Sequence, residues 1–119
     1  MKTSATLPRQ QRIARSTRAL MLATAGLATA YAAKGVRVNA VNPGATVTDR
    51  LKEGFAADAR ANGISEEEAM KRTTARIPLG RMAEPREIAD AVVFLASPRA
   101  SYISGVSLTM DGVMTPTVL

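Results

Sequence analysis

Residues 35–48 read Gly-Val-Arg-Val-Asn-Ala-Val-Asn-Pro-Gly-Ala-Thr-Val-Thr, and the rest of the chain is best interpreted from this stretch. Within it, residues 36–41 alternate in the period-two pattern of a β-strand. Asn42-Pro43-Gly44 predicts the end of that strand, because proline gives no N–H to a sheet and glycine permits a sharp turn. A helical pattern follows. A strand, a glycine turn and a helix start form the geometry of ligand sites in open α/β sheets, and a plain connection has the same pattern.

Composition limits the chemistry that the chain can perform. Its 119 residues are enough for one small domain, and 46% of them are hydrophobic. The absence of cysteine excludes disulfides and thiolate metal sites. The absence of histidine excludes a histidine-based triad and the commonest transition-metal ligand, so we expect no metal site. Any acid–base chemistry must therefore use Tyr, Lys, Asp, Glu or a cofactor.

The net charge of +6 is unevenly distributed. Residues 1–48 carry seven basic and no acidic side chains, whereas residues 49–119 carry nine basic and ten acidic ones. Four arginines recur every three residues near the start of the chain, namely Arg9, Arg12, Arg15 and Arg18. Such a row is typical of phosphate contacts or of a solvated helix start. No aromatic residue lies among them to stack on bases, so we do not expect nucleic acid as a partner.

The beginning of the chain divides into two parts. Residues 1–13 are expected to be an irregular, basic segment. Residues 14–33 predict an alanine-rich helix that Lys34-Gly35 ends. Its packed face is expected to comprise Leu20, Thr24, Leu27 and Tyr31. A secretory signal cleaved after Ala28-Thr29-Ala30 is an alternative. No apolar run reaches the length of a membrane span, and we expect a cytoplasmic protein without a membrane partner.

Three further helices and one strand are predicted downstream of Gly44. The first helix covers about 49–61, is capped by Thr48 or Asp49 and ends at Asn62-Gly63. Ser65 and Glu68 form a capping box that opens the second. The third begins at Pro85 and runs to about Ala96, with Ile88, Val92 and Leu95 as its buried stripe, and a strand then covers 105–110.

Helices separate the two predicted strands, so the strands are most simply parallel neighbours. Two parallel strands are too few for a stable sheet, because parallel sheets normally have more strands and helices on both faces. The predicted fold is therefore α/β, a partial doubly wound (Rossmann-type) domain of two parallel strands with flanking helices. We expect the chain to be a fragment that folds poorly by itself.

Four segments in a fixed order carry a resemblance to a known family. They are Gly-Val-Arg-Val-Asn-Ala-Val-Asn-Pro-Gly (35–44), Ile-Pro-Leu-Gly-Arg (77–81), Glu-Pro-Arg-Glu-Ile-Ala-Asp-Ala-Val-Val-Phe-Leu-Ala-Ser (84–97) and Tyr-Ile-Ser-Gly with a later Met-Asp-Gly (102–112). From about Leu20 to Gly112 the chain resembles the carboxyl-terminal part of the short-chain dehydrogenase/reductase family. The resemblance implies that residues 14–119 belong to a dinucleotide-binding domain of an NAD- or NADP-dependent oxidoreductase with an alcohol or carbonyl substrate. It also implies a homo-oligomer formed through helix 14–33. By the same resemblance, residues 45–76 correspond to the family's substrate-covering region, and Leu51, Phe55 and Met70 are candidate apolar wall residues for a substrate, with helix packing as the alternative explanation.

The resemblance assigns a cofactor role to the turn after the first strand. In the family, this Pro-Gly turn lies beside the nicotinamide and a threonine four residues later contacts its carboxamide. The corresponding cofactor-binding residues here are Pro43, Gly44, Thr46 and Thr48. Close backbone approach at Gly44 and a hydroxyl at Thr48 would orient a flat ring for hydride transfer. A strand-ending turn followed by a helix cap is the simpler alternative for the same residues.

Several family features are absent from the printed sequence. No glycine-rich turn is present to bind the pyrophosphate. The family's Tyr-x-x-x-Lys would fall at Ile13 and Thr17, or one residue later, and neither frame supplies the tyrosine. Val113 stands where the family usually has the second glycine of a pair. We therefore predict no catalytic residue here and expect the chain to be inactive by itself. A non-catalytic remnant that binds another protein through its alanine-rich helix is the alternative function.

Overall fold

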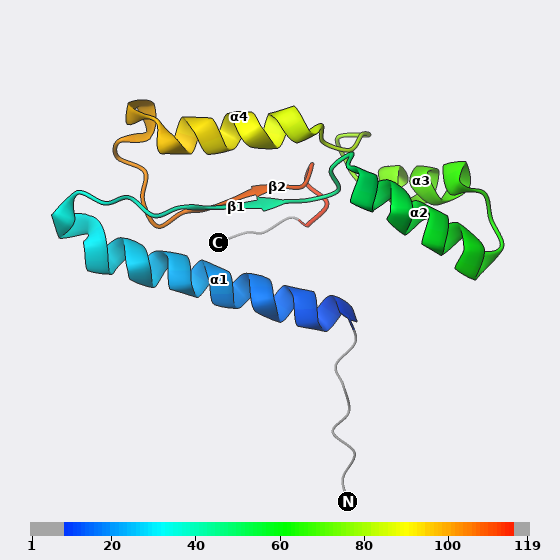
Figure 1. Cartoon of the computed structure of the whole chain (residues 1–119), viewed down its shortest axis with the longest axis horizontal. Coiled ribbons are helices and arrows are strands. Elements are labelled where there is room, and N and C mark those ends of the chain that lie inside the picture. Colours follow the sequence, from blue (N-terminus) through cyan, green and yellow to red (C-terminus); the bar gives the residue numbers. More distant parts are fainter. Residues whose placement is uncertain (1–8, 116–119) are drawn as a thin grey trace, which may run out of the picture. The chain divides into compact units, whose positions relative to one another are not determined.

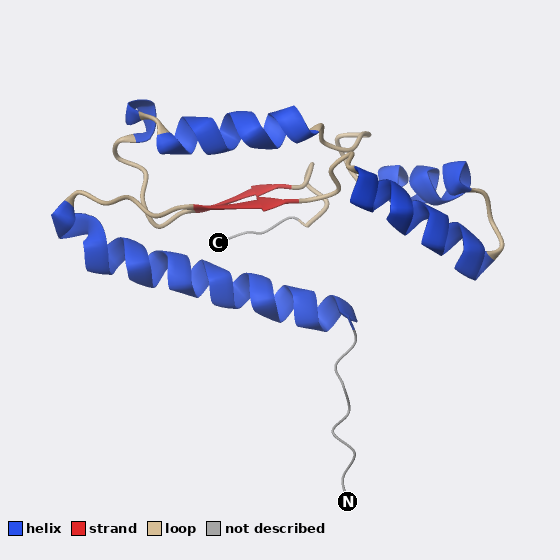
Figure 2. Ribbon diagram, viewed as in Figure 1, coloured by secondary structure: helices blue, strands red, loops and turns tan. Residues whose placement is uncertain are grey.

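The computed structural model describes residues 9–115, with side chains from Ser16 onward (Figures 1 and 2). The elements are α1 (Arg9–Tyr31), β1 (Ala40–Pro43), α2 (Asp49–Asn62), α3 (Glu66–Ala75), α4 (Pro85–Ala96) and β2 (Ser107–Met110), with short 3-10 turns at Ala32–Lys34 and Pro98–Ala100. The chain divides into two units. The first joins residues up to Ala40 with Ser101–Leu108, and the second joins Val41–Ala100 with residues from Thr109 onward.

Helix α1 is longer at its start than the sequence pattern predicted. It begins at Arg9, so residues 9–13 are helical rather than irregular, while residues 1–8 lie outside the described part of the chain. Arginine and glutamine are good helix formers, which explains why the helix extends into this polar segment. Of the arginine row, only Arg18 lies among the described side chains, and it is exposed. Gly35 follows the terminal 3-10 turn with a φ of 73°, which confirms the glycine stop.

The packed face of α1 differs from the predicted one. Thr24 and Ala28 are buried, whereas Leu20, Leu27 and Tyr31 are 58%, 49% and 42% exposed. Ala28 lies against Gly105, where an added Cβ would be only 3.4 Å from the Cβ of Ala28. The buried Thr24 hydroxyl donates a hydrogen bond to the Leu20 carbonyl (2.8 Å), so its burial leaves no unpaired polar group.

Strands β1 and β2 form a two-stranded parallel sheet, as predicted (Figure 2). In the first unit, Ala40 N–H donates to the Val106 carbonyl (2.9 Å), and in the second, Gly44 N–H donates to the Met110 carbonyl (2.9 Å). Both partners advance in the same direction along the chain, which is the pattern of a parallel pair.

Strand β1 begins at Ala40, later than the predicted start at Val36. One backbone bond, from Gly105 N–H to the Val38 carbonyl (2.7 Å), and several side-chain bonds hold the preceding backbone in place of a regular ladder. Asn39 donates its amide to the Ile103 carbonyl (3.0 Å) and accepts from Val106 N–H (3.2 Å). Val38 N–H donates to the Ser104 hydroxyl (3.2 Å). The alternation of hydrophobic residues does not indicate where a polar side chain takes the place of a backbone partner. The pattern therefore predicted a longer strand than the structure has.

The caps of α2 confirm the sequence reading. Leu51 N–H donates to the Thr48 hydroxyl oxygen (3.3 Å), which satisfies one of the free amide groups at the start of the helix. Gly63 closes the helix with a φ of 64°. Ala59 is buried, and Leu51 and Phe55 are half-buried on the same face as predicted.

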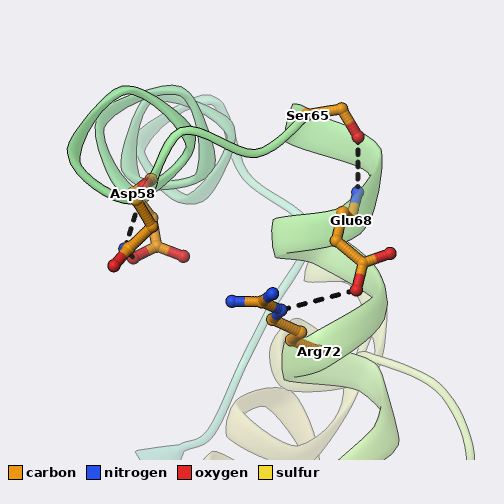
Figure 3. Close-up of polar contacts among 5 residues, drawn as sticks. Asp58, Ser65, Glu68 and Arg72 are labelled. Carbon is orange, nitrogen blue, oxygen red and sulfur yellow. Dashed lines mark hydrogen bonds and ion pairs between the residues drawn. The ribbon is translucent and has the colours of Figure 1, made fainter.

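The start of α3 has the predicted Ser65 cap, which Figure 3 shows, but the hydrogen bonds of the described residues do not include the second half of a capping box, from Ser65 N–H to the Glu68 carboxylate. Glu68 N–H donates to the Ser65 hydroxyl (3.1 Å), and the Glu68 carboxylate accepts from Arg72 (3.4 Å). On α2, the Asn62 amide donates to Asp58 (2.8 Å). These pairs are exposed and each contributes little to stability. The three consecutive acidic residues Glu66, Glu67 and Glu68 form the first turn of this helix.

Helix α4 begins as predicted, with Pro85 in its first turn and reciprocal hydrogen bonds between Glu84 and Glu87. Its predicted stripe is only partly buried, because Leu95 is buried while Val92 is 48% exposed. The buried apolar residues among the described side chains are few, and most of them are alanines: Ala28, Ala59, Ala69, Ile77, Leu95 and Ala100. Such a core removes little apolar surface from water, so its hydrophobic stabilisation is small. None of the described helices has both the length and the apolar character to cross a membrane.

Candidate functional site

Gly44, at the end of β1, is packed against the end of β2. Besides its hydrogen bond to Met110, its Cα faces Asp111, and a Cβ built at Gly44 would lie 2.6 Å from the Asp111 Cα and 2.7 Å from its Cβ. Real Cβ atoms do not approach a backbone atom so closely. The sequence interpretation explained this glycine by the approach of a ligand. The structure gives a different reason, since the neighbouring protein backbone itself requires glycine here.

Ala83 holds the other side of the same turn. Ala83 N–H donates to the Ala45 carbonyl (3.0 Å), and Val47 N–H donates to the Ala83 carbonyl (2.9 Å). The two bonds make Thr46 and Ala83 an isolated parallel bridge. The segment after Gly44 is therefore an extended strand-like connection, fixed by the backbone on both sides.

The four predicted site residues follow one another along this connection. Pro43 and Thr48 are exposed, and Gly44 and Thr46 are half-buried. The Thr46 hydroxyl donates to the Gly44 carbonyl (3.2 Å), so its hydrogen is used within the turn. The Thr48 hydroxyl instead caps α2 by accepting a hydrogen bond from Leu51 N–H, and a hydroxyl that accepts can still donate. The helix-cap role of Thr48 is therefore compatible with donation to a ligand.

An ion pair between Arg81 and Glu87 closes the loop that carries Ala83. Nη1 and Nη2 of Arg81 donate to the two carboxylate oxygens of Glu87 at 2.8 and 2.6 Å, and Glu84 N–H donates to the same carboxylate at 2.8 Å. The hydrogen bond from Arg81, followed by that from the Glu84 backbone, lowers the pKa of Glu87 to about 2. The same hydrogen bond raises the pKa of Arg81. The sequence pattern did not reveal this pair, because helical periodicity relates residues within one helix and Arg81 lies before the helix that begins at Pro85.

The second unit contains a cavity of about 540 Å³ next to the turn. Its lining is mostly apolar and includes Ile77, Leu79, Met110 and Ala45, together with the Arg81–Glu87 pair. Successive side chains of an extended segment point to opposite sides. The cavity therefore lies on the side of the turn that Ala45 faces, opposite the Thr46 side chain.

The chain after β2 forms a left-handed turn that also lines this cavity. The Asp111 carboxylate accepts hydrogen bonds from Val113 N–H (3.0 Å) and Thr115 N–H (2.9 Å). Gly112 and Val113 have φ values of 63° and 70°. The left-handed conformation costs a residue with a Cβ about 1–2 kcal/mol, and it costs glycine nothing comparable. The backbone of Val113 is therefore strained, whereas a glycine at this position would be unstrained. The hydrogen bonds of Asp111 offset this strain.

Comparison with known proteins places these features in a family. A model of the family described as Enoyl-(Acyl carrier protein) reductase matches residues 1–115. The chain is 45% identical over 78 residues to L-rhamnose 1-dehydrogenase (NAD(P)(+)) of Azotobacter vinelandii, covering 66% of this chain and 27% of that protein. It therefore spans less than a third of the length of that relative.

Solved structures agree with the sequence comparison. A short chain dehydrogenase family protein from Francisella tularensis superimposes with a TM-score of 0.86 at 34% identity, covering 94% of this chain and 46% of that one. L-sorbose reductase from Gluconobacter frateurii, in complex with NADPH and L-sorbose, gives a TM-score of 0.77 at 32% identity, covering 85% and 39%.

Proposed function

Because the chain belongs to the short-chain dehydrogenase/reductase family, we propose that residues 14–119 form the carboxyl-terminal part of an NAD- or NADP-dependent oxidoreductase with an alcohol or carbonyl substrate. The observation that carries this proposal is the exposed Thr48 hydroxyl at the end of a rigidly held Pro-Gly turn. The bound NADPH of L-sorbose reductase supports a nicotinamide cofactor. The NAD(P)(+) specificity in the name of the rhamnose dehydrogenase supports the same cofactor class.

The residues of the turn fit a nicotinamide ring. Thr48 retains a hydroxyl hydrogen to donate to a carboxamide oxygen, and Pro43 offers an exposed, rigid apolar surface. Backbone hydrogen bonds with Met110 and Ala83 hold the turn, so binding would cost little ordering of the protein. When bound, the cofactor supplies the hydride, and the role of these residues is to orient its ring.

The printed residues by themselves are proposed not to turn over substrate. They contain neither a glycine-rich phosphate turn nor a Tyr-x-x-x-Lys pair. The first is needed to hold the pyrophosphate, and the second to transfer a proton to or from the substrate oxygen. We therefore expect nicotinamide binding to be weak when it is measured on this chain alone.

The proposed site predicts that nicotinamide mononucleotide binds at the turn and that the Thr48 hydroxyl contributes to its affinity. In a chemical-shift titration, we expect shifts at the Gly44, Thr46 and Thr48 amides. Thr48→Val should weaken binding about fivefold, because one hydrogen bond is lost. Thr48→Ser should retain the affinity.

Adenosine monophosphate is the control ligand, since it has a phosphate and a ribose but no nicotinamide. We expect it to leave the turn unshifted. Equal affinity of Thr48→Val and Thr48→Ser for nicotinamide mononucleotide would contradict the role of the hydroxyl. Shifts confined to residues away from 43–48 would contradict the site itself.

The exposed face of α1 favours a second role, association through this helix. Leu20, Leu27 and Tyr31, which share one side of the helix by their spacing, are 58%, 49% and 42% exposed, although they are large and apolar. Such side chains on one helix mark an interaction surface. We expect the chain to form a homo-oligomer, or to bind another protein, through α1.

Light scattering should show a mass above that of the monomer, and Leu20→Glu with Leu27→Glu should reduce it. Val93→Glu on α4 is the control and should leave the mass unchanged.

A further inference from the structure

The loop between α3 and α4 is closed on itself by side-chain hydrogen bonds. Arg81 makes two bonds to the Glu87 carboxylate and a third to the Met82 carbonyl (3.1 Å). The same carboxylate accepts from Glu84 N–H, and Glu87 N–H donates back to the Glu84 carbonyl (3.0 Å). One carboxylate thus connects the start of the loop to the first turn of α4.

Ala83 lies inside this closed loop and makes the two backbone bonds that hold residues 45–47. The methyl side chain of Ala83 cannot form a hydrogen bond that would fix the position of this residue. Its placement depends on the residues on either side of it, which are those that the Arg81–Glu87 pair ties together. The ion pair is therefore connected to the turn that carries Thr48 by hydrogen bonds to Met82 and Glu84, the covalent neighbours of Ala83, and by the two hydrogen bonds of Ala83 itself.

We propose that Arg81 and Glu87 are positioning residues that hold Ala83, and through it the Thr46–Thr48 turn, in the geometry that binds the nicotinamide. This inference rests on the proposed function for the identity of the ligand. It does not rest on it for the mechanical link between the loop and the turn. The pair acts through the backbone and touches no reacting atom.

The geometry distinguishes this pair from an ordinary surface ion pair. The side chains are 60% and 40% exposed, and exposed pairs usually contribute little. Here the contact is bidentate, which fixes the plane of both groups. By comparison, the pair between Arg72 and Glu68 lies within one helix, has a single bond of 3.4 Å, and connects nothing outside α3. Its loss should have no effect at the turn.

Amide hydrogen exchange of the 119-residue chain tests the link. In Glu87→Gln we expect exchange at Val47 and Ala83 to accelerate about two- to fivefold, as loss of an exposed ion pair allows. Arg81→Lys should give a smaller increase, because lysine keeps the charge and loses the bidentate contact. The Gly63 amide, bonded to the Ala59 carbonyl in α2, should be unaffected. Glu68→Gln, the matched control, should leave Val47 and Ala83 unchanged.

The affinity for nicotinamide mononucleotide is a second measurement, which a purely structural role of the ion pair would leave unchanged. Glu87→Gln should weaken its binding at the turn by a similar factor, while Glu68→Gln should not. The proposal is overturned if Val47 and Ala83 exchange at the parent rate, if Gly63 accelerates equally, or if the nucleotide binds both variants alike. Failure of the parent chain to show nucleotide shifts at 43–48 would contradict the proposed function, and the exchange rates would still decide the mechanical link.

Discussion

Replacing Gly44 with alanine is expected to lower the free energy of unfolding by about 3 kcal/mol, at the upper end of the cost of overpacking. The added Cβ would lie 2.6 Å from the Cα of Asp111. That neighbour is backbone and cannot rotate away as a side chain would. The backbone segments at the ends of β1 and β2 must therefore move apart where Gly44 N–H donates to the Met110 carbonyl. This movement weakens that hydrogen bond as well as the packing. Urea unfolding followed by circular dichroism measures the change.

Gly54→Ala is the matched control for this substitution. Gly54 lies within α2, and an alanine Cβ there meets no atom within 4 Å. Alanine is the better helix former, so the control should gain up to about 1 kcal/mol. The two substitutions are chemically identical and should have opposite signs. A Gly44→Ala chain as stable as the parent would show that β1 and β2 are not packed as described.

Replacing Gly112 with alanine is expected to cost about 3 kcal/mol as well, for two separate reasons. Gly112 has a φ of 63°, a conformation that a residue with a Cβ rarely adopts. The added Cβ would also lie 2.5 Å from Cγ2 of Ile77, which is buried and has little room to move. Strain and crowding should therefore add.

Gly63→Ala separates these two contributions. Gly63 has nearly the same φ, 64°, but an added Cβ would meet nothing within 4 Å. Only the backbone strain remains, so the expected loss is about 1–2 kcal/mol. Urea unfolding of both variants gives the crowding contribution as the difference between the two losses. Equal losses at the two sites would mean that Ile77 relaxes freely and that the turn after β2 is loosely packed.

The sequence pattern predicted the elements whose ends are set by local chemistry. Ser65 and Pro85 were each placed at a helix start, and either Thr48 or Asp49 at another, from residue type and spacing alone. The structure confirms Ser65 and Pro85 and shows that Thr48 is the cap of α2. Caps work in this way because the partners of a cap lie within one turn of it. The parallel pairing of β1 and β2 was likewise deducible, from the helices that separate them.

The buried face of α1 was predicted wrongly because burial is decided by the partner. Periodicity assigned Leu20 and Leu27 to the packed side, whereas the buried residues of the helix are Thr24 and Ala28, and Ala28 lies against Gly105. The short β1 has a similar cause, because Asn39 bonds to residues more than 60 positions away. No local pattern contains that information.

The sequence by itself determined the order of elements, the helix caps, the absence of histidine and cysteine chemistry, and the Pro-Gly turn with its threonines at 46 and 48. These depend on residue type and on neighbours a few positions away. Only the tertiary structure decided that Gly44 is required by Asp111, that Ala83 fixes the turn, and that Arg81 pairs with Glu87. Each of these three is a contact between separate segments, and its strength depends on distances that the folded backbone alone sets.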